Sequence, residues 1–402
     1  MRILFLTPQL PFPPQKGTAL RNWGLIQGLA ERHEISLLSF VEPDRKPTIA
    51  APLGRACRRI ALVPQPVRTR WERIQDMVTT SQPDMALRLA SQAYDRALRD
   101  WMADHPFDIV QIEGIELAPY LDTLRESPQN AQIVFDDHNC EYVLQERTFL
   151  TDLYSPNRWS GAAYSFVQWR RLRRYEARIC READQVLAVS DADAEALRDL
   201  VPGLEIHVIP NGIDTDAYQP SLSDADEADS YRLVFTGTMD FRPNVDAVLW
   251  FAREVLPLVQ AKVPNVRFEV VGQRPHPRLK PLAQDPSIVL TGWVEDVKPY
   301  FERATVYVAP LRMGGGTRLK LLEAMSMEKP IVATSLGAEG YPVETGRELL
   351  LADSPSDFAD AVVSLLESRA RRLELGRVAR AFVEEWYDWR VIVPQLEAVY
   401  EA

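Results

Sequence analysis

Short apolar runs alternate with longer segments of helical periodicity, and this alternation limits the folds that the chain can adopt. The runs of the first half lie at 2–7, 35–40, 108–111, 132–136, 185–189 and 206–209. Those of the second half lie at 232–236, 267–271, 288–290, 306–309, 331–333 and 349–351. Helical patterns, such as 19–32 and 162–183, fall between them. Strands separated by helices form parallel sheets of βαβ units, so the pattern predicts an α/β chain of two doubly wound domains.

The segment 219–230 separates the two sets of runs. It is acidic, and Leu222 is its only large apolar residue, a composition typical of a solvated linker. We therefore expect an N-terminal domain over 1–218 and a C-terminal domain over 219–384. Residues 385–402 have a helical pattern and are expected to pack back on the N-terminal domain. Pro394 should kink or split the last helical segment, because proline lacks an N–H and clashes with the preceding turn.

Composition argues against several classes of protein. The 402 residues carry a net charge of −11, which argues against a general nucleic-acid binder. Cys57, Cys140 and Cys180 form no C-x-x-C pair, so we expect no zinc site and a reducing cytoplasm. No apolar run reaches the roughly 18 residues that a membrane-spanning helix needs. The expected location is cytoplasmic, with peripheral contact at the inner membrane face as an alternative.

The stretch 304–325 has the clearest chemical pattern. After a β-rich run come three glycines, a threonine, two cations and an acidic residue: Gly314, Gly315, Gly316, Thr317, Arg318, Lys320 and Glu323. A strand that passes through a glycine turn into a helix presents N–H groups and a positive dipole end to an anion. Cations in the first helical turn oppose that dipole, so Arg318 and Lys320 indicate a bound phosphate. Glu323, about one turn later, can accept hydrogen bonds from ribose hydroxyls, and the stretch therefore indicates a nucleotide-sugar enzyme.

A second glycine turn follows the predicted strand 232–236. Gly237 and Thr238 make the turn, and Arg242 can reach a diphosphate; a surface arginine on a βα loop is the alternative. Asn244 is expected to cap a helix that begins at Val245.

Two weaker candidates lie in other turns after predicted strands. Gly17, near the start of the first helix, can let a phosphate or sugar approach the backbone, or it can serve a plain turn. Backbone groups at Val294 can read a nucleobase edge, or they too can be purely structural.

His138 follows the strand 132–136, beside Asp136 and Asp137. At the carboxyl end of a strand its imidazole would face the crevice between the domains, where it can bind a sugar hydroxyl or assist proton transfer. A structural histidine is the alternative. The remaining histidines are interpreted as structural: His33, His105, His207 and His276.

The segment 158–181 is rich in arginine. At helical spacing Arg171, Arg174, Arg178 and Arg181 share one face, and apolar residues share another. Such a helix can lie on an anionic membrane surface, or it can be a domain helix whose apolar stripe is core. The segment 43–83 has no readable motif but adds further arginines, which favour an anionic or lipid-linked partner: Arg55, Arg58, Arg59, Arg68, Arg70 and Arg73.

Together these motifs resemble those of the family 4 retaining glycosyltransferases, which have two Rossmann-like domains facing a central cleft (the GT-B architecture). The matching segments are PQKG at 14–17, DHN at 137–139, ADQVLAVS at 183–190, VIPNGID at 208–214, FTG at 235–237 and LEAM at 322–325. The resemblance covers nearly the whole chain. It implies an acceptor-side N-terminal domain and a donor-binding C-terminal domain. It also implies transfer of a sugar from a nucleotide diphosphate sugar to an acceptor hydroxyl in polysaccharide, glycolipid or other glycoconjugate biosynthesis.

The resemblance further implies that the anomeric configuration is kept, and that neither a cofactor nor an obligatory metal is needed. The acceptor would be a saccharide or a lipid-linked molecule. By the same resemblance, Glu323 matches the ribose-binding glutamate, His138 the active-site histidine and Gly17 the N-domain glycine near the donor. The arginine and lysine that hold the diphosphate in many members are only partly represented, by Thr238 and Arg242.

One position departs from the family pattern. Members commonly have two glutamates with seven residues between them, and counting back from Glu323 gives Gly315. The donor-sugar contact would then be made by backbone N–H groups of 314–316, or be lost. In the expected mechanism Arg318, Lys320 and Arg242 stabilise the charge on the departing diphosphate, whose phosphate takes the acceptor proton. His138 positions a sugar hydroxyl.

Two other functions stay open on the sequence alone. A nucleotide-sugar epimerase or phosphorylase shares the architecture and would recruit carboxylates such as Glu113, Asp136 and Asp137. Isomerisation of the donor alone would identify an epimerase. A non-catalytic relative, supported by the glycine at 315, would bind nucleotide without releasing nucleoside diphosphate.

Overall fold

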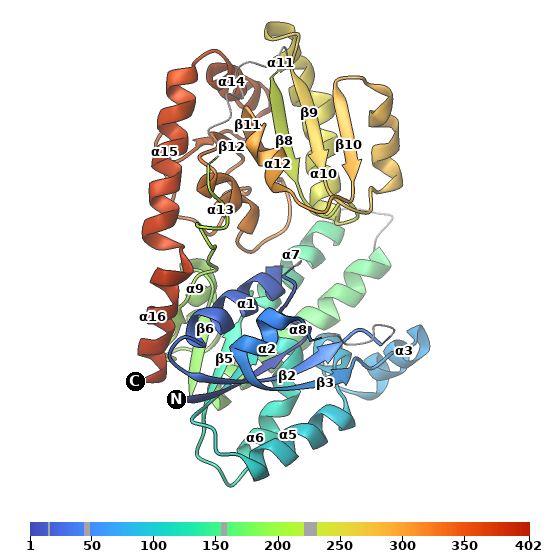
Figure 1. Ribbon diagram of the computed structural model, residues 1–402. Coiled ribbons are helices and arrows are strands. Elements are labelled where there is room, and N and C mark those ends of the chain that lie inside the picture. Colours follow the sequence, from blue (N-terminus) through green and yellow to red (C-terminus); the bar gives the residue numbers. More distant parts are fainter. Residues whose placement is uncertain (15–16, 44–48, 154–158, 221–230) are drawn as a thin grey trace. The chain divides into compact units, whose positions relative to one another are not determined.

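The computed structural model describes residues 1–14, 17–43, 49–153, 159–220 and 231–402 (Figure 1). Within these residues the chain forms two compact units: unit 1 contains 1–211 and 392–402, and unit 2 contains 212–391. Four segments with sequence predictions lie partly outside the described residues, namely 14–17, 43–83, 158–181 and 219–230.

Unit 1 is built on a seven-stranded parallel sheet in the order β3–β2–β1–β4–β5–β6–β7. Its strands are β1 Arg2–Thr7, β2 Glu34–Val41, β3 Cys57–Pro64, β4 Ile109–Glu113, β5 Gln132–Asp137, β6 Gln185–Ala188 and β7 His207–Val208. Ile3 of β1 pairs with Ile35 on one side and with Ile109 on the other. The strand order therefore reverses between β1 and β4, the kind of position where doubly wound sheets bind ligands.

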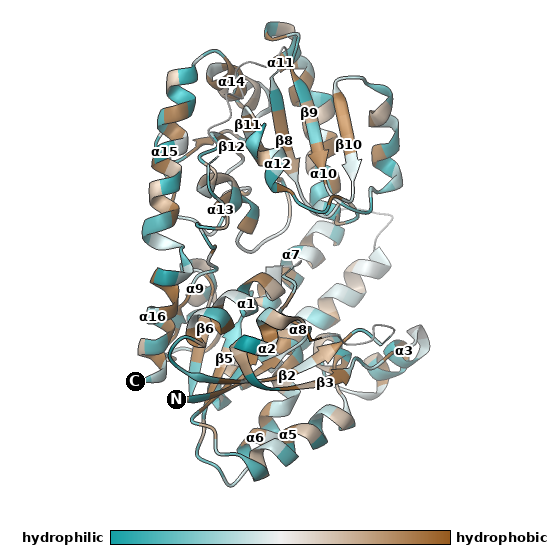
Figure 2. Ribbon diagram, viewed as in Figure 1, coloured by the Kyte–Doolittle hydropathy of each residue, from teal (hydrophilic) through white to brown (hydrophobic). Residues whose placement is uncertain are grey.

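The helices of unit 1 are α1 Gly17–Leu29, α2 Ala51–Ala56, α3 Arg70–Thr79, α4 Asp84–Arg88, α5 Gln92–Asp104, α6 Leu121–Arg125, α7 Glu141–Leu153, α8 Trp159–Glu182 and α9 Asp191–Leu200, with a 3-10 helix at Ile115–Tyr120. Serine hydroxyls cap two of them: Ser91 accepts from Tyr94 N at the start of α5, and Ser190 accepts from Asp193 N at the start of α9. The central strands β1 and β2 are buried along nearly their whole length, as expected for a parallel sheet covered by helices on both faces (Figure 2).

Unit 2 contains a six-stranded parallel sheet in the order β10–β9–β8–β11–β12–β13. Its strands are β8 Arg232–Thr236, β9 Arg267–Val271, β10 Ile288–Gly292, β11 Val306–Ala309, β12 Ile331–Ala333 and β13 Leu350–Leu351. Its helices are α10 Arg242–Trp250, a π-helical turn at Phe251–Val255, α11 Leu256–Lys262, a 3-10 helix at Pro277–Gln284, α12 Lys298–Glu302, α13 Leu319–Ser326, α14 Pro355–Leu366 and α15 Arg369–Trp386. Here the order reverses between β8 and β11. The predicted fold class, two doubly wound parallel sheets, is confirmed.

Of the two effects expected of Pro394, a kink or a split of the terminal helical segment, the split does not occur. The segment divides at residues 387–388, between α15 and α16 (Trp389–Tyr400), and Pro394 lies inside α16. The division has a local cause, because the Asp388 carboxylate accepts a hydrogen bond from Arg390 N at 2.8 Å at the start of α16 and another from the hydroxyl of Thr215. From Ile392 onward α16 belongs to unit 1.

Close packing fixes α16 against α1 in unit 1. A Cβ added to Gly28 would lie 2.5 Å from the side chain of Val393, so only glycine allows this approach. Glu397 accepts from His33 Nε2 at 2.8 Å and pairs with Arg32 at 2.6 Å. His33 thus has the structural role expected of it. No helix among the described residues is long and apolar enough to cross a bilayer.

Candidate active site

The glycine loop of unit 2 leads from β11 into α13. Gly314 and Gly316 have φ of 102° and 78°, values that glycine adopts without a steric penalty. Arg318 is the N-cap residue of α13, and its Nη1 donates to the carbonyl of Gly315 at 2.7 Å. Four of the predicted residues therefore lie where the strand, the turn and the helix meet, at the carboxyl end of β11.

Lys320 and Glu323, on the first two turns of α13, form an ion pair. The Lys320 ammonium donates to both carboxylate oxygens, at 3.0 and 3.1 Å. Glu323 is 3% exposed, whereas the side chain of Lys320 is 39% exposed. Burial and the nearby Glu323 charge raise the pKa of Tyr218, so its hydroxyl stays protonated. The carboxylate is thus fixed and buried, while its cation can reach solvent.

The turn after β8 lies beside the glycine loop. A Cβ added to Gly314 would lie 3.3 Å from Pro243 of α10, which places the start of α10, including the partly buried Arg242, next to the loop. A Cβ on Gly272 would lie 1.7 Å from the carbonyl oxygen of Gly237, so the ends of β8 and β9 also meet closely. The structure thus brings the turn at Gly237, Thr238 and Arg242 together with the loop at 314–318, at the point where the sheet order reverses.

Two predictions about unit 2 differ from the structure. The helix after β8 begins at Arg242, not at Val245, and Asn244 does not cap it. Asn244 lies in its first turn and donates from Nδ2 to the carbonyl of Thr238 at 2.9 Å, which holds the turn closed. The nucleobase contact expected of the Val294 backbone stays a prediction. The side chain of Val294, after the edge strand β10, is partly buried and packs against the apolar cluster that contains Leu321 and Leu322.

In unit 1 the Arg21 side chain of α1 is buried against the end of β5. Its guanidinium binds both oxygens of Asp136, with Nε to Oδ2 at 2.9 Å and Nη2 to Oδ1 at 3.0 Å. Its Nη1 donates to the carbonyl of Pro210 at 3.0 Å. Both Arg21 and Asp136 are at most 1% exposed. Asp136 is therefore a structural counter-ion, and it is less suited to the acid–base role that an epimerase would give it.

A chain of hydrogen bonds ends at His138. The Tyr400 hydroxyl of α16 donates to Gln111 Oε1, and Gln111 Nε2 donates to Glu113 Oε1 at 2.6 Å. Glu113 Oε2 bonds His138 Nε2 at 2.7 Å. When the amide of Asn22 is turned so that its nitrogen faces this carboxylate, it donates to the same oxygen at 2.7 Å. Glu113 is fully buried at the end of β4 and fixes the ring of the histidine.

The electrostatics of this cluster favour a protonated histidine. Burial by itself lowers the pKa of His138, but the hydrogen bond to Glu113 and the charges of Asp136 and Glu113 outweigh it and raise the pKa. The three side chains also lie close enough to hold a metal, with ligand atoms within 4.8 Å of one another. However, Arg21 occupies both oxygens of Asp136, and a protonated His138 cannot ligate, so the donor set fits a metal poorly. That no metal is required stays a prediction.

Asp137, the next residue, faces the other side of β5. Burial and the Glu176 carboxyl raise the pKa of Asp137 well above its usual range. Glu176 accepts from the backbone N–H groups of Glu141 and Tyr142, at 2.8 and 2.9 Å, at the start of α7. Glu176 therefore orders this turn, and a proton on Asp137 reduces the repulsion between the two buried carboxyls. Burial also raises the pKa of Glu141 to about 8.

The other predicted positions have simpler settings. Gly17 is the exposed first residue of α1. His207 bonds Gln185 at 2.9 Å, and His276 caps a 3-10 helix by accepting from Arg278 N, so both are structural. The arginine-rich α8 is mainly a domain helix, because Leu172, Tyr175 and Ile179 are buried in the unit 1 core.

The sequence did not single out Arg21, Gln111 and Tyr400 as parts of the histidine cluster. Arg21 occurs among apolar residues of the predicted helix 19–32. An arginine at such a position is expected to be buried and therefore to pair with a carboxylate, and this was its signal in the sequence. Glu113 lies two residues beyond the predicted strand 108–111 and one βα unit before the histidine, and this position was its only signal.

Solved structures of other proteins have the same architecture. A sucrose-phosphate synthase from Thermosynechococcus elongatus superposes with a TM-score of 0.74 at 18% identity, covering 100% of this chain and 98% of that one. Anabaena Alr3699/HepE, solved in complex with UDP and glucose, superposes with a TM-score of 0.67 at 15% identity, covering 100% and 99%. The fold is that of the GT-B glycosyltransferases.

Family profiles identify the chain more closely. The profile described as "Glycosyltransferase Family 4" matches residues 16–217, and that described as "Glycosyl transferases group 1" matches residues 230–368. The chain belongs to glycosyltransferase family 4, as the motifs predicted, and it is a glycosyltransferase.

Two relatives differ in how far they are characterised. One is an "uncharacterized 44.6 kDa protein in cps region" of Klebsiella pneumoniae, 20% identical over 96% of each chain. Another is a phosphatidyl-myo-inositol mannosyltransferase of Mycolicibacterium smegmatis, 28% identical over 77% of this chain and 75% of its own.

Proposed function

We propose that the protein transfers a sugar from a nucleotide diphosphate sugar to a hydroxyl of a saccharide or lipid-linked acceptor, with retention of anomeric configuration. The observation that supports this most is the Lys320–Glu323 pair on the first turns of α13, beside the glycine loop and the start of α10. A buried carboxylate and an accessible cation one turn apart suit the ribose and the diphosphate of such a donor.

Donor binding would break the ion pair between Lys320 and Glu323. Glu323 is held in place by burial and would accept the ribose hydroxyls, which replace Lys320 as hydrogen-bond donors. The more exposed Lys320 ammonium would turn to the diphosphate, joined there by Arg318 and Arg242. These cations and the N–H groups of the glycine loop would stabilise the charge that builds on the leaving diphosphate. The departing phosphate would take the proton of the acceptor hydroxyl, which attacks from the same face.

His138 would act as a hydrogen-bond donor and not as a base. Its Nε2 is committed to Glu113 at 2.7 Å, and its raised pKa favours the form in which Nδ1 also carries a proton. A protonated imidazole held in one orientation can donate to a sugar oxygen and so position the donor. Gly17, at the start of α1, leaves room for the donor to approach the backbone.

The relatives indicate the class of acceptor. Several act on phosphatidyl-myo-inositol, as their names state, which favours a glycolipid acceptor for this chain as well. A protein that modifies such an acceptor would be cytoplasmic, in peripheral contact with an anionic membrane. Neither cofactor nor obligatory metal is proposed, because cations of the protein are placed to neutralise the diphosphate.

The test is a thermal-shift screen against UDP-, GDP- and ADP-sugars, followed by measurement of nucleoside diphosphate release with a membrane lipid extract as acceptor. We expect one nucleotide class to raise the melting temperature and release of its diphosphate to require the extract. Isomerised donor without an acceptor would indicate an epimerase. Binding without turnover across the acceptors would indicate a non-catalytic relative.

A further inference from the structure

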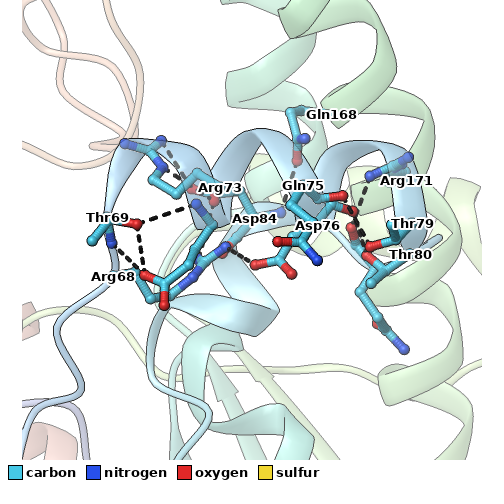
Figure 3. Close-up of polar contacts among 12 residues, drawn as sticks. Arg68, Thr69, Arg73, Gln75, Asp76, Thr79, Thr80, Asp84, Gln168 and Arg171 are labelled. Carbon is cyan, nitrogen blue, oxygen red and sulfur yellow. Dashed lines mark hydrogen bonds and ion pairs between the residues drawn. The ribbon is translucent and has the colours of Figure 1, made fainter.

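The helix α3 in unit 1 is amphipathic, but its polar face is turned toward the protein and its apolar face toward solvent. Its polar face is bonded to the protein: Arg68, just before the helix, binds Asp76 at 2.6 Å and Asp84 at 3.1 Å, and Arg73 binds Asp84 at 3.1 Å. Figure 3 shows these contacts, together with the side chain of Gln168 from α8, which accepts from Asp84 N at 2.8 Å. Several independent polar contacts therefore determine which face of α3 is turned inward.

The opposite face of α3 is apolar and exposed. Trp71, Ile74 and Val78 follow the i, i+3, i+7 spacing of one helical face, and they are 79%, 51% and 77% exposed. Val67, just before the helix, is 78% exposed. We call Trp71, Ile74 and Val78 the apolar α3 face. No residue of α3 whose side chain is described is buried, which is unusual for an apolar stripe because it normally covers a core.

The surroundings of this face are positively charged, although the whole chain is acidic. Residues 51–84 and 159–174 contain ten arginines and only three carboxylates, in a chain with net charge −11, and one of the three, Asp84, pairs with Arg68 and Arg73. The two segments are neighbours, because Arg171 of α8 donates to the backbone carbonyls of Met77 and Gln82, at 2.7 and 3.2 Å (Figure 3). Exposed arginines of α8 in this region include Arg170 and Arg174. An apolar stripe with tryptophan beside arginines complements an anionic lipid surface.

We propose that the apolar α3 face inserts into the interfacial region of an anionic membrane and docks unit 1 there. This inference rests on the proposed function only in that a lipid-linked acceptor would give the docking a purpose. It replaces the basic face of α8 as the principal membrane contact, since Leu172, Tyr175 and Ile179 of that helix are core and Arg171 is bonded to backbone carbonyls. Arg68 and Arg73 orient the helix through their ion pairs, and the insertion itself is apolar.

The experiment is co-sedimentation of the full chain with vesicles of phosphatidylglycerol and phosphatidylcholine, at 50 mM and 500 mM salt. We expect the unmodified protein to bind at low salt and to keep part of its binding at high salt, because salt screens arginine–lipid attraction but not apolar insertion. The variant W71S/I74S/V78S should bind more weakly by on the order of 10²-fold, an estimate from partial burial of three large side chains. All three are exposed, so the variant should fold.

A matched control replaces three exposed apolar residues of unit 2. Leu258, Leu373 and Trp386 are 43%, 45% and 54% exposed on α11 and α15, and their triple serine variant should bind vesicles like the unmodified protein. Absence of vesicle binding by the unmodified protein, or equal binding by the α3 variant, would overturn the proposal. So would a dimer that the α3 variant converts to monomer, because a second copy would then cover the face.

Donor turnover separates this inference from the proposed function. The α3 variant should release nucleoside diphosphate from donor with a soluble acceptor at the unmodified rate, while transfer to an acceptor embedded in vesicles should fall with the binding. If the unmodified protein binds vesicles through α3 but turns over no nucleotide sugar, the proposed function fails and the docking surface stands.

Discussion

Replacing Glu113 with glutamine tests whether the buried carboxylate holds His138 in a charged, oriented state. Three donors converge on Glu113: the amide of Gln111 at 2.6 Å, His138 Nε2 at 2.7 Å and, in its turned orientation, the amide of Asn22 at 2.7 Å. A glutamine offers one oxygen and adds a donor of its own, so at least one buried donor loses its acceptor. Removing one partner of a buried ionic cluster costs about 3–5 kcal/mol, and we expect Glu113→Gln to lower the free energy of unfolding by that order.

The same change should shift the pH dependence of transfer. In the unmodified protein the pKa of His138 is raised, so the protonated form persists above the ordinary histidine range and activity falls only as pH rises through the raised value. Without the Glu113 charge the pKa of His138 should drop, and the loss of activity should move to lower pH.

Urea unfolding followed by circular dichroism, and kcat/KM measured between pH 5 and 9, are the assays. Glu126→Gln, which removes a 64% exposed carboxylate of the same unit, is the control and should change neither. If Glu113→Gln changed neither the free energy of unfolding nor the pH at which kcat/KM falls, Glu113 would not hold His138 in a charged, oriented state.

Further predictions concern the donor loop, a buried carboxyl and a close glycine contact. Lys320→Ala and Glu323→Ala should each slow donor turnover by roughly 10²–10³, measured as nucleoside diphosphate release. Stability should fall as pH rises above the ordinary aspartate pKa, because the raised pKa of Asp137 lets the folded state keep a proton that the unfolded chain has released. Asp137→Asn should flatten that slope by up to about 1.4 kcal/mol per pH unit, measured by urea unfolding at several pH values. Gly272→Ala should destabilise the protein by about 3 kcal/mol or more in thermal unfolding, since its Cβ would lie 1.7 Å from the Gly237 carbonyl oxygen.

Matched variants accompany these predictions. Lys262→Ala removes an exposed lysine of unit 2 that pairs with Asp360, and it should leave turnover unchanged. Gly54 lies within α2, and in Gly54→Ala the new Cβ would lie 3.7 Å from the side chain of Ile49. This is an ordinary contact, so the change should not destabilise the protein. Full turnover in both loop variants would mean that the donor site is misplaced, and a slope unaltered in Asp137→Asn would mean that another group holds the proton.

Local sequence patterns predicted most of the fold. The bounds of β1, β8, β9, β11 and β12 agree with the predicted runs, because a short apolar run between helical segments is easy to recognise in the sequence. The edge strand β3 was missed, since its sequence CRRIALVP has two arginines after its first residue and lies in a segment without a regular pattern. Edge strands tolerate such residues because one side of the strand is unpaired.

The candidate site was predictable only where its residues are close in sequence. The loop from Gly314 to Glu323 is one continuous motif, and its strand, turn and helix could be read directly. The cluster around His138 joins residues from α1, β4, β5 and α16, and Tyr400 and Gln111 are 289 residues apart. No periodicity in a single sequence pairs such positions. The predicted N-cap role of Asn244 was wrong. An asparagine before an apolar helix is a frequent cap, whereas here its amide donates to the carbonyl of Thr238 and closes the preceding turn.

The most direct test of the central claim is a proton NMR time course of the anomeric signals, with the nucleotide sugar selected by thermal shift and its glycolipid acceptor. We expect the donor's anomeric signal to decay while a product signal of the same anomeric configuration and free nucleoside diphosphate appear together. We also expect Lys320→Ala to slow all three changes in proportion. A product of opposite configuration would contradict retention, and a donor that isomerises or stays intact while bound would contradict sugar transfer.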